Sequence, residues 1–245
     1  MTLTDEKLRQ IRGNRICMIF QDPMSTLNPV YRVGRQIAEG IKYHRKLSTA
    51  EAMSRAIDAM RQVGIPTPEA RAQAYPHELS GGMQQRASIA AALAMEPDLL
   101  IADEPTTALD PTIQSQILDL MSRLKDQHGT ALILVTHNLA ILAEIADRIA
   151  VMYAGSIIEI GNKNDVLDRP KHPYTKGLMD SIPTTEQRTG RLYQIPGAMP
   201  SLANLPTGCK FIDRCQFADP AICSVRPKLT TSANGQAVAC HKPLC

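Results

Sequence analysis

Three small residues, Ser80, Gly81 and Gly82, open an alanine-rich run that extends to Met95. If the run is a helix, its first turn lacks bulky side chains, so its backbone N–H groups and the positive end of the helix dipole are exposed. Such a helix end suits a phosphate group. A lone Ser-Gly-Gly sequence is more often a flexible turn, so this pattern needs support from other segments.

Two adjacent carboxylates, Asp103 and Glu104, follow four aliphatic or small residues at 99–102. The run predicts a buried strand that brings both carboxylates to one edge of a sheet. An oxygen ligand for Mg²⁺ and a base for an attacking water would then lie side by side. An aliphatic run that ends in Asp-Glu is more often an ordinary strand end. Combined with the phosphate-binding pattern, however, it indicates nucleoside triphosphate chemistry.

Three more segments accompany these two in a defined order. Gln21 follows a strand-like run, a Thr-Ala-Leu-Asp sequence follows Glu104, and His137 follows another strand-like run. In this order the segments resemble those of the ATP-binding subunits of ABC transporters. The matches are Gln21 for the Q-loop, 79–83 for the signature motif, 99–104 for Walker B, 107–110 for the D-loop and His137 for the switch histidine.

The resemblance implies a role for each residue near the bound nucleotide. Asp103 would hold Mg²⁺ and Glu104 would polarise the attacking water. His137 would contact the γ-phosphate of ATP. Gln21 would transmit the presence of the metal and nucleotide to the helical subdomain, which faces the permease. Carboxylates suit the metal and base roles, and imidazole and amide groups suit oriented hydrogen bonds.

The resemblance also implies that two subunits pair head to tail. Ser80, Gly81 and Gly82 of one subunit would then contact ATP bound by the other, and Asp110 would couple the two sites. Met83 stands where many relatives have glutamine, and a thioether is a poor hydrogen-bond partner, so we assign Met83 no polar role.

One motif of the family does not occur in the 245 residues. No G-x-x-x-x-G-K-S/T sequence (Walker A) is found, and residues 1–14 alone precede the first strand-like run at 15–20. We therefore expect a truncated or mis-started reading frame. We also expect one face of the sheet to be uncovered and the chain by itself to be inactive.

Strand-like runs that alternate with helical periodicity predict an α/β fold with a mainly parallel sheet. The resemblance implies that this sheet is a partial P-loop NTPase sheet of the ABC ATPase type with a helical subdomain. We expect a partial ATPase domain at 1–161, with the helical subdomain at about 30–97. Helices are predicted at 33–62, 80–95 and 112–126, and a hairpin is predicted at 149–160. A Pro/Cys-rich C-terminal extension at 162–245 completes the chain.

Composition is typical of a globular protein without a membrane span. The net charge of +3 is too small to indicate a nucleic-acid partner. No apolar run approaches the ~20 residues that a bilayer requires. We expect a soluble, peripheral subunit that reaches the cytoplasmic face of the inner or plasma membrane through partner proteins.

Five of the six cysteines lie in the C-terminal extension. Four of them, Cys209, Cys215, Cys223 and Cys240, follow the spacing C-x5-C-x7-C-x16-C. Zinc prefers closer pairs, so this spacing weakens zinc and leaves an iron–sulfur cluster open. Reduced cysteines in a loop-rich tail are the alternative.

The segments around these cysteines resemble the C-terminal extension of the oligopeptide and dipeptide importer ATPases. The matching segments are 172–175, 195–197, 208–215 and 238–241. Some members of that subfamily carry a 4Fe-4S cluster, so the resemblance implies one on the four cysteines. Cys17 lies in a predicted strand and is expected to be core packing, and Cys245 has no assigned partner.

The expected function is that of an ATP-hydrolysing subunit that powers import of dipeptides, oligopeptides or a nickel complex. The implied partners are a second ATPase subunit, transmembrane permease subunits and, indirectly, an extracytoplasmic peptide-binding protein. Two alternatives remain. The chain could be a non-transport ABC ATPase, or a non-catalytic iron–sulfur or interaction remnant.

Overall fold

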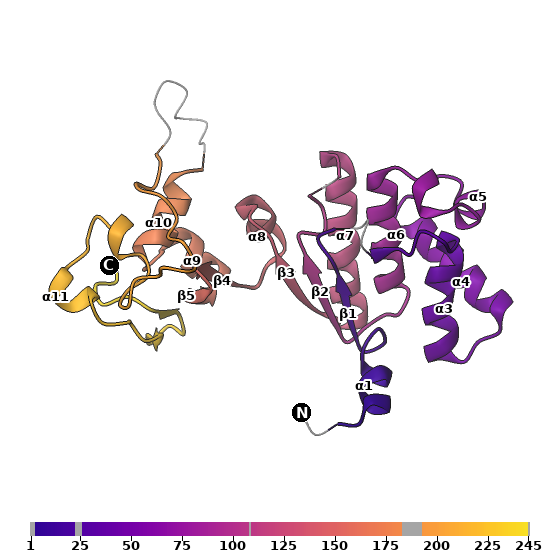
Figure 1. Cartoon of the computed structure of the whole chain (residues 1–245), viewed down its shortest axis with the longest axis horizontal. Helices are drawn as coiled ribbons and strands as arrows, with labels where there is room; N and C mark the ends of the chain where they lie inside the picture. The colour runs from indigo at the N-terminus through magenta and orange to yellow at the C-terminus, as the bar shows by residue number, and fades with distance from the viewer. Residues whose placement is uncertain (1–2, 23–25, 108, 183–192, 245) are drawn as a thin grey trace. The chain divides into compact units, whose positions relative to one another are not determined.

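The computed structural model describes residues 3–22, 26–107, 109–182 and 193–244, with the backbone alone at residue 128. The chain forms two compact units, Met1–His137 and Asn138–Cys245 (Figure 1). Each unit has its own sheet and its own helices, and each is described here by itself.

The first unit contains a three-stranded parallel sheet in the order β1-β2-β3. Its strands are β1 (Ile16–Ile19), β2 (Leu99–Asp103) and β3 (Ala131–Val135). In parallel strands the carboxyl ends meet at one edge of the sheet, and here Asp103 is the register partner of Val135. The residues that follow the three strands therefore lie at a common edge.

Helices accompany the sheet of the first unit (Figure 1). They are α1 (Asp5–Ile11), α3 (Val33–Arg45), α4 (Thr49–Gln62), α5 (Pro68–Ala72), the 3-10 helix η1 (Pro76–Glu78), α6 (Gly81–Leu93) and α7 (Pro111–His128). Helices α3, α4 and α6 pack on one another, α6 also contacts β1, and α7 contacts β3. Ala87 and Ala90 of α6 are fully buried, which lets neighbouring helices approach closely. Within the described ranges, no helix has the length and apolar character needed to cross a membrane.

The single helix expected at 33–62 is wrong, because the structure has two. Helix α3 ends at Lys46, which adopts a left-handed conformation with φ 54°. Helix α4 begins after Ser48, whose hydroxyl accepts the Glu51 amide while the Glu51 carboxylate accepts the Ser48 amide. This capping box satisfies two otherwise unpaired donors at the helix start. The S-x-x-E sequence is its signal.

One face of the sheet is exposed and apolar, as expected from the sequence. Alternate residues of β1 and β3 point to this face and are 39 to 50% exposed, namely Ile16, Met18, Ile133 and Val135. Cys17 and Ile19 alternate with the exposed residues of β1, and both are buried on the opposite face. Within the described residues of the first unit, the sheet therefore has a packed side and an exposed side.

The second unit is organised by an antiparallel hairpin. Strands β4 (Arg148–Tyr153) and β5 (Ser156–Asn162) are joined by Ala154 and Gly155, which both have positive φ, at 45° and 73°. Two residues with positive φ match the right-handed twist of the strands, so they make a tight hairpin turn. The hairpin agrees with the sequence prediction.

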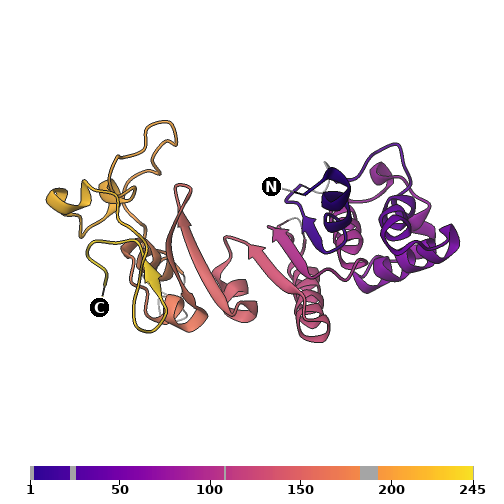
Figure 2. The ribbon, with the colours of Figure 1, turned by 90° about the horizontal axis from the view of Figure 1, so that it is seen from below.

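The segment after Asn162 is more regular than the sequence indicated, and it belongs to the hairpin. Its elements are α9 (Lys163–Asp168), α10 (Pro173–Asp180), the 3-10 helix η2 (Ile212–Arg214), α11 (Pro220–Cys223), β6 (Thr230–Thr231) and β7 (Ala237–Val238), with α8 (Leu139–Ile145) preceding β4. Strand β7 pairs with β5 and β6 pairs with β7. Figure 2 shows the C-terminal segment, in yellow, beside the hairpin. Phe211 packs against Tyr153 of β4, with ring centroids 5.3 Å apart.

These contacts place the boundary between compact units at 137/138 rather than at 161/162. The hairpin that we assigned to the ATPase domain shares a core with the C-terminal segment. That core includes Ile149, Val151, Tyr153, Ile158 and Phe211. The sequence prediction followed the change in proline content, but burial of this apolar cluster decides the boundary.

Two glycines of α3 make a matched test of this packing. A Cβ at Gly34 would lie 2.6 Å from the Ala72 Cβ, whereas a Cβ at Gly40 meets no atom within 4 Å. Gly34→Ala should destabilise the protein by about 1–3 kcal/mol through overpacking. Gly40→Ala should stabilise it by about 0.5–1 kcal/mol, because alanine loses less entropy in a helix. Chemical denaturation followed by circular dichroism measures both, and equal effects would contradict the packing of α3 on α5.

Candidate functional site

The carboxylate of Glu104 is the centre of the candidate site. Its Oε2 accepts hydrogen bonds from Gln21 Nε2 at 3.2 Å and from Thr107 Oγ1 at 3.1 Å. Its Oε1 lies 3.0 Å from His137 Nδ1. Three of the residues expected at the site, Gln21, Glu104 and His137, therefore meet although they are far apart in the sequence.

The parallel sheet explains why these residues meet. Gln21 follows β1, Glu104 follows β2 and His137 follows β3, so all three lie at the carboxyl edge of the sheet. The Glu104 amide donates to the Val135 carbonyl at 2.9 Å, which fixes Glu104 against the end of β3. Glu104 also has φ 44°, a left-handed conformation that is costly for a residue with a side chain and is common at functional sites.

The hydrogen bonds around Glu104 favour its charged form. The pKa of Glu104 is lowered, first by the hydrogen bond with His137 and then by that from Thr107, with a smaller effect from Gln21. A hydrogen bond to a carboxylate stabilises the anion. The Glu104 side chain is 22% exposed, so water can reach it. The group is therefore a charged, solvent-accessible hydrogen-bond acceptor, as a general base for a water molecule must be.

Two residues to which the sequence analysis assigned no role support this centre. Thr107 donates to the Glu104 carboxylate from the turn after β2. Gln85 is buried on α6, and its Nε2 donates to the Pro105 carbonyl at 2.8 Å. A hydroxyl three residues after Glu104 was a readable signal for a local turn contact. Nothing in the sequence distinguishes Gln85 from its neighbour Gln84.

The other expected nucleotide-binding residues lie at helix starts. Ser80 is the N-cap of α6, where its Oγ accepts the Met83 amide at 3.3 Å, and Gly81 is exposed with open space around it. Asp110 is the N-cap of α7. Within the described residues, no hydrogen bond joins these helix starts to Glu104.

Two more expected residues take their places from neighbouring elements. Asp103 is the last residue of β2, and Gly82 lies in the first turn of α6. Asp103 thus directly precedes Glu104 at the sheet edge, as the strand pattern predicted. Gly82 continues the helix start formed by Ser80.

Four cysteines of the second unit line one small cavity. Cys209, Cys215, Cys223 and Cys240 share it with His172 and other residues, and its volume is about 20 Å³. The Cys209 amide donates to the Cys223 carbonyl at 2.9 Å, which holds two of the cysteine-bearing segments together. A spacing that is wide in the sequence is therefore compatible with a common location.

The cavity differs from a formed metal site. No three His, Cys, Asp or Glu side chains in the described part of the chain converge closely enough to hold a metal ion. Burial raises the pKa of Cys209, Cys215 and Cys240, the last to about 11, with a further contribution from neighbouring cysteines. The expected cluster is thus not supported by the side-chain positions, although the thiols gather at one place.

The remaining two cysteines are Cys17 and Cys245. Cys17 is buried in β1, and burial raises the pKa of its thiol to about 11, in agreement with a packing role. Cys245 lies outside the described residues.

Solved structures with the same architecture define the fold class. The dimeric ATP-binding cassette MJ0796 in a post-hydrolysis state, bound to ADP and Pi, matches with a TM-score of 0.61 and 29% identity, over 66% of this chain and 68% of that one. The cbiO1 structure from Clostridium perfringens matches with a TM-score of 0.54 and 34% identity, over 67% of this chain and 62% of that one. Residues 2–107 match the ABC transporter family model. The fold is that of an ABC ATPase.

Sequence relatives narrow the class. Residues 158–223 match the family model of the oligopeptide/dipeptide transporter C-terminal region. A probable peptide ABC transporter ATP-binding protein of Sinorhizobium fredii is 52% identical over 99% of this chain and 72% of its own length. The dipeptide transport ATP-binding protein DppD of Escherichia coli is 46% identical over 99% of this chain and 74% of its own length. The chain belongs to the family of oligopeptide/dipeptide ABC transporter ATP-binding subunits.

Proposed function

We propose that this chain hydrolyses ATP to drive import of dipeptides or oligopeptides through a membrane permease. The hydrogen-bonded Glu104 carboxylate carries this proposal, because it supplies a charged base where strands β2 and β3 end. The relatives' names as peptide and dipeptide transport proteins support the cargo class. They do not favour a nickel complex, a non-transport ATPase or a non-catalytic remnant.

Each residue at the sheet edge has a task in the proposed reaction. Glu104 accepts a hydrogen bond from the attacking water and orients it toward the γ-phosphate. His137 and Gln21 hold the Glu104 carboxylate and offer further polar atoms to the phosphate and to the ligands of the metal. Asp103 supplies oxygen ligands of the kind that Mg²⁺ prefers, and bound Mg²⁺ would neutralise charge on the phosphates.

Pairing of two ATPase subunits is part of the proposal. The exposed start of α6, with Ser80, Gly81 and Gly82, offers backbone N–H groups to a phosphate held by the second subunit. Asp110 at the start of α7 would couple the two sites. The solved cassette MJ0796 is dimeric, which supports the pairing. The remaining proposed partners are permease subunits at the cytoplasmic face of the membrane and, indirectly, a peptide-binding protein.

The proposed activity requires a cradle for the β- and γ-phosphates. No G-x-x-x-x-G-K-S/T sequence occurs in the 245 residues, so we expect the isolated chain to turn over ATP far more slowly than an intact relative. A chimera tests the site itself. A segment that contains a G-x-x-x-x-G-K-S/T phosphate loop, placed before residue 1, should restore turnover. Glu104→Gln in that chimera should lower kcat by roughly 10²–10⁴-fold, because the amide lacks a basic oxygen.

Gln116→Glu on α7 is a control of similar size outside the cluster, and it should leave kcat within a few-fold. Retained ATP binding by the Glu104→Gln chimera would separate a chemical defect from a folding defect. Turnover of that variant within a few-fold of its parent would contradict the role of Glu104. Fast turnover by the isolated chain would contradict the need for an added phosphate loop.

We propose a second task for the cysteines, namely that Cys209, Cys215, Cys223 and Cys240 bind a 4Fe-4S cluster. Their common cavity supports this, and four thiolates suit iron. The cavity of about 20 Å³ holds little more than one water, so binding would require the four side chains to turn outward and lose their protons. The cluster would then staple a segment that has few apolar residues of its own.

Anaerobic purification tests the cluster. The protein should be brown and contain about four iron and four sulfide per chain. Serine at any one of the four positions should bleach it and lower its unfolding temperature, whereas Cys17→Ser should keep the colour because Cys17 lies in the other unit. Stoichiometric zinc without iron would contradict the cluster, and colour that survives Cys240→Ser would contradict the ligand set.

A further inference from the structure

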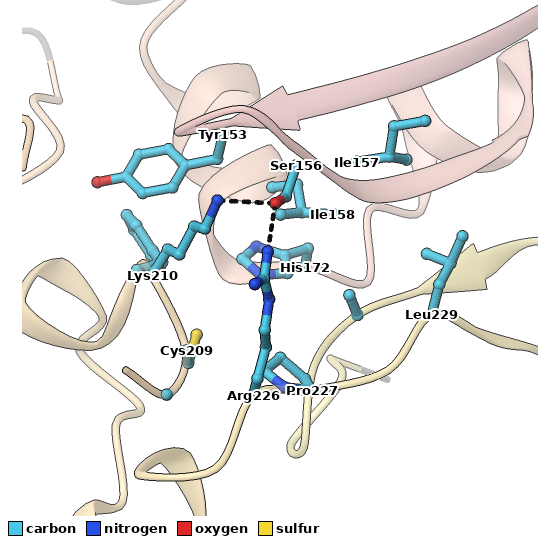
Figure 3. Close-up of a pocket in the computed structure, with 13 residues that line it drawn as sticks. Tyr153, Ser156, Ile157, Ile158, His172, Cys209, Lys210, Arg226, Pro227 and Leu229 are labelled. Atoms are coloured by element: carbon cyan, nitrogen blue, oxygen red, sulfur yellow. Dashed lines mark hydrogen bonds between the residues drawn. The ribbon is translucent and has the colours of Figure 1, made fainter. Parts of the chain in front are cut away.

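A second cavity of the C-terminal unit lies beside the hairpin turn, and its polar groups are mostly hydrogen-bond donors (Figure 3). It has a volume of about 190 Å³. Lys210 and Arg226 enter it from two different loops, and Ser156 enters it from the start of β5. The proposed ATPase reaction uses none of these residues.

Two cations converge on one hydroxyl in this cavity. Lys210 Nζ donates to Ser156 Oγ at 2.9 Å, and Arg226 Nη2 donates to the same oxygen at 3.0 Å (Figure 3). The two nitrogens therefore lie within about 6 Å of each other. Like charges at this distance repel, so the arrangement is unfavourable unless a negative group compensates it.

The described residues do not supply that negative group. Within the described residues, neither Lys210 nor Arg226 forms an ion pair with a carboxylate. Lys210 also donates to the Ala154 carbonyl at 2.6 Å, which is a neutral acceptor. Across the described ranges, Arg226 donates a hydrogen bond to Ser156 alone, so most of its donors are available for a ligand.

His172 adds another donor to the wall. Its Nδ1 accepts the Tyr174 amide at 3.0 Å, so in the neutral ring the proton is on Nε2. Burial lowers the pKa of His172 to about 4, which keeps the ring neutral near pH 7. The polar wall thus combines two cations, a hydroxyl and an imidazole N–H.

The cavity also has apolar lining residues, and it is small. Ile157, Pro227 and Leu229 line it, and Ile157 and Leu229 are 44 and 45% exposed. A volume of 190 Å³ is below the roughly 300–1,000 Å³ typical of sites for drug-sized ligands. The cavity therefore fits a small molecule that has an anionic end and an apolar end.

We propose that this cavity binds a small organic anion, whose carboxylate or phosphate lies between Lys210 and Arg226 and whose apolar part contacts Ile157, Pro227 and Leu229. The anion neutralises the two cations, and its oxygens can accept hydrogen bonds from both. A guanidinium group binds carboxylate and phosphate in the same two-pronged geometry. The site therefore recognises the anionic group of the ligand more than the rest of the molecule.

Calorimetry with defined probes tests the proposal on the 245-residue chain. N-acetyl-L-leucine presents a carboxylate with an apolar side chain, and phenyl phosphate presents a phosphate with an apolar ring. N-acetyl-L-leucinamide is the neutral match. At least one of the two anions should bind, and whichever binds more tightly identifies the head group. The neutral amide should bind at least tenfold more weakly than the carboxylate if the carboxylate is the preferred head group.

Variants separate this site from general charge attraction. Arg226 is exposed, so Arg226→Gln should fold, and it should weaken binding roughly tenfold or more. Arg226→Lys keeps the charge but loses the two-pronged geometry, so it should weaken binding less than Arg226→Gln does. Lys171→Gln is the matched control, because Lys171 also donates to a serine, Ser232, at 3.2 Å but lies outside the cavity. Overturning results are no binding of either anion at millimolar concentration, or equal losses in Arg226→Gln and Lys171→Gln.

Discussion

The hydrogen bonds that converge on the Glu104 carboxylate connect segments that the parallel sheet brings to one edge. Gln21 reaches it from the end of β1 and His137 from the end of β3, while Thr107 reaches it from the turn after β2. The left-handed backbone at Glu104 is compatible with this arrangement because the Val135 carbonyl accepts its amide. The nucleotide chemistry that we propose requires these contacts, since they keep the carboxylate charged and directed toward the sheet edge.

The C-terminal unit depends in a similar way on a buried carboxylate, Glu159. It is fully buried and accepts hydrogen bonds from the Lys171 and His172 amides, at 2.7 and 2.9 Å, and from the Gln236 amide group at 2.7 Å. These bonds join β5 to the start of α10 and to the segment before β7. They also fix His172, which lines both the cavity formed by the four cysteines and the cavity proposed to bind an organic anion. The two candidate binding cavities of this unit therefore share His172 as a lining residue and Glu159 as the group that holds it.

The sequence predicted the parts of the structure that local patterns determine. The strands at 16–19, 99–103 and 131–135 and the helix at 111–128 were found because aliphatic runs and helical periodicity mark them. The meeting of Gln21, Glu104 and His137 followed from the motif order. The break at Lys46 was missed because the apolar spacing continues across it, although the Ser48 capping box was readable. The pairing of β5 with β7 and the burial of Phe211 on Tyr153 join distant segments, and no local pattern reports such contacts. For the same reason, no pattern in the sequence predicted the cavity beside Lys210 and Arg226.

The pKa of Glu104 is the most direct measure of the central interaction. Carboxyl-selective ¹³C NMR on the protein, with Glu104→Gln used to assign the signal, would give the titration of this single group. The account predicts a pKa below the ordinary glutamate range, because the His137 and Thr107 hydrogen bonds stabilise the anion, and a rise when His137 is replaced by alanine. A pKa at or above the ordinary range that does not change in His137→Ala would contradict it.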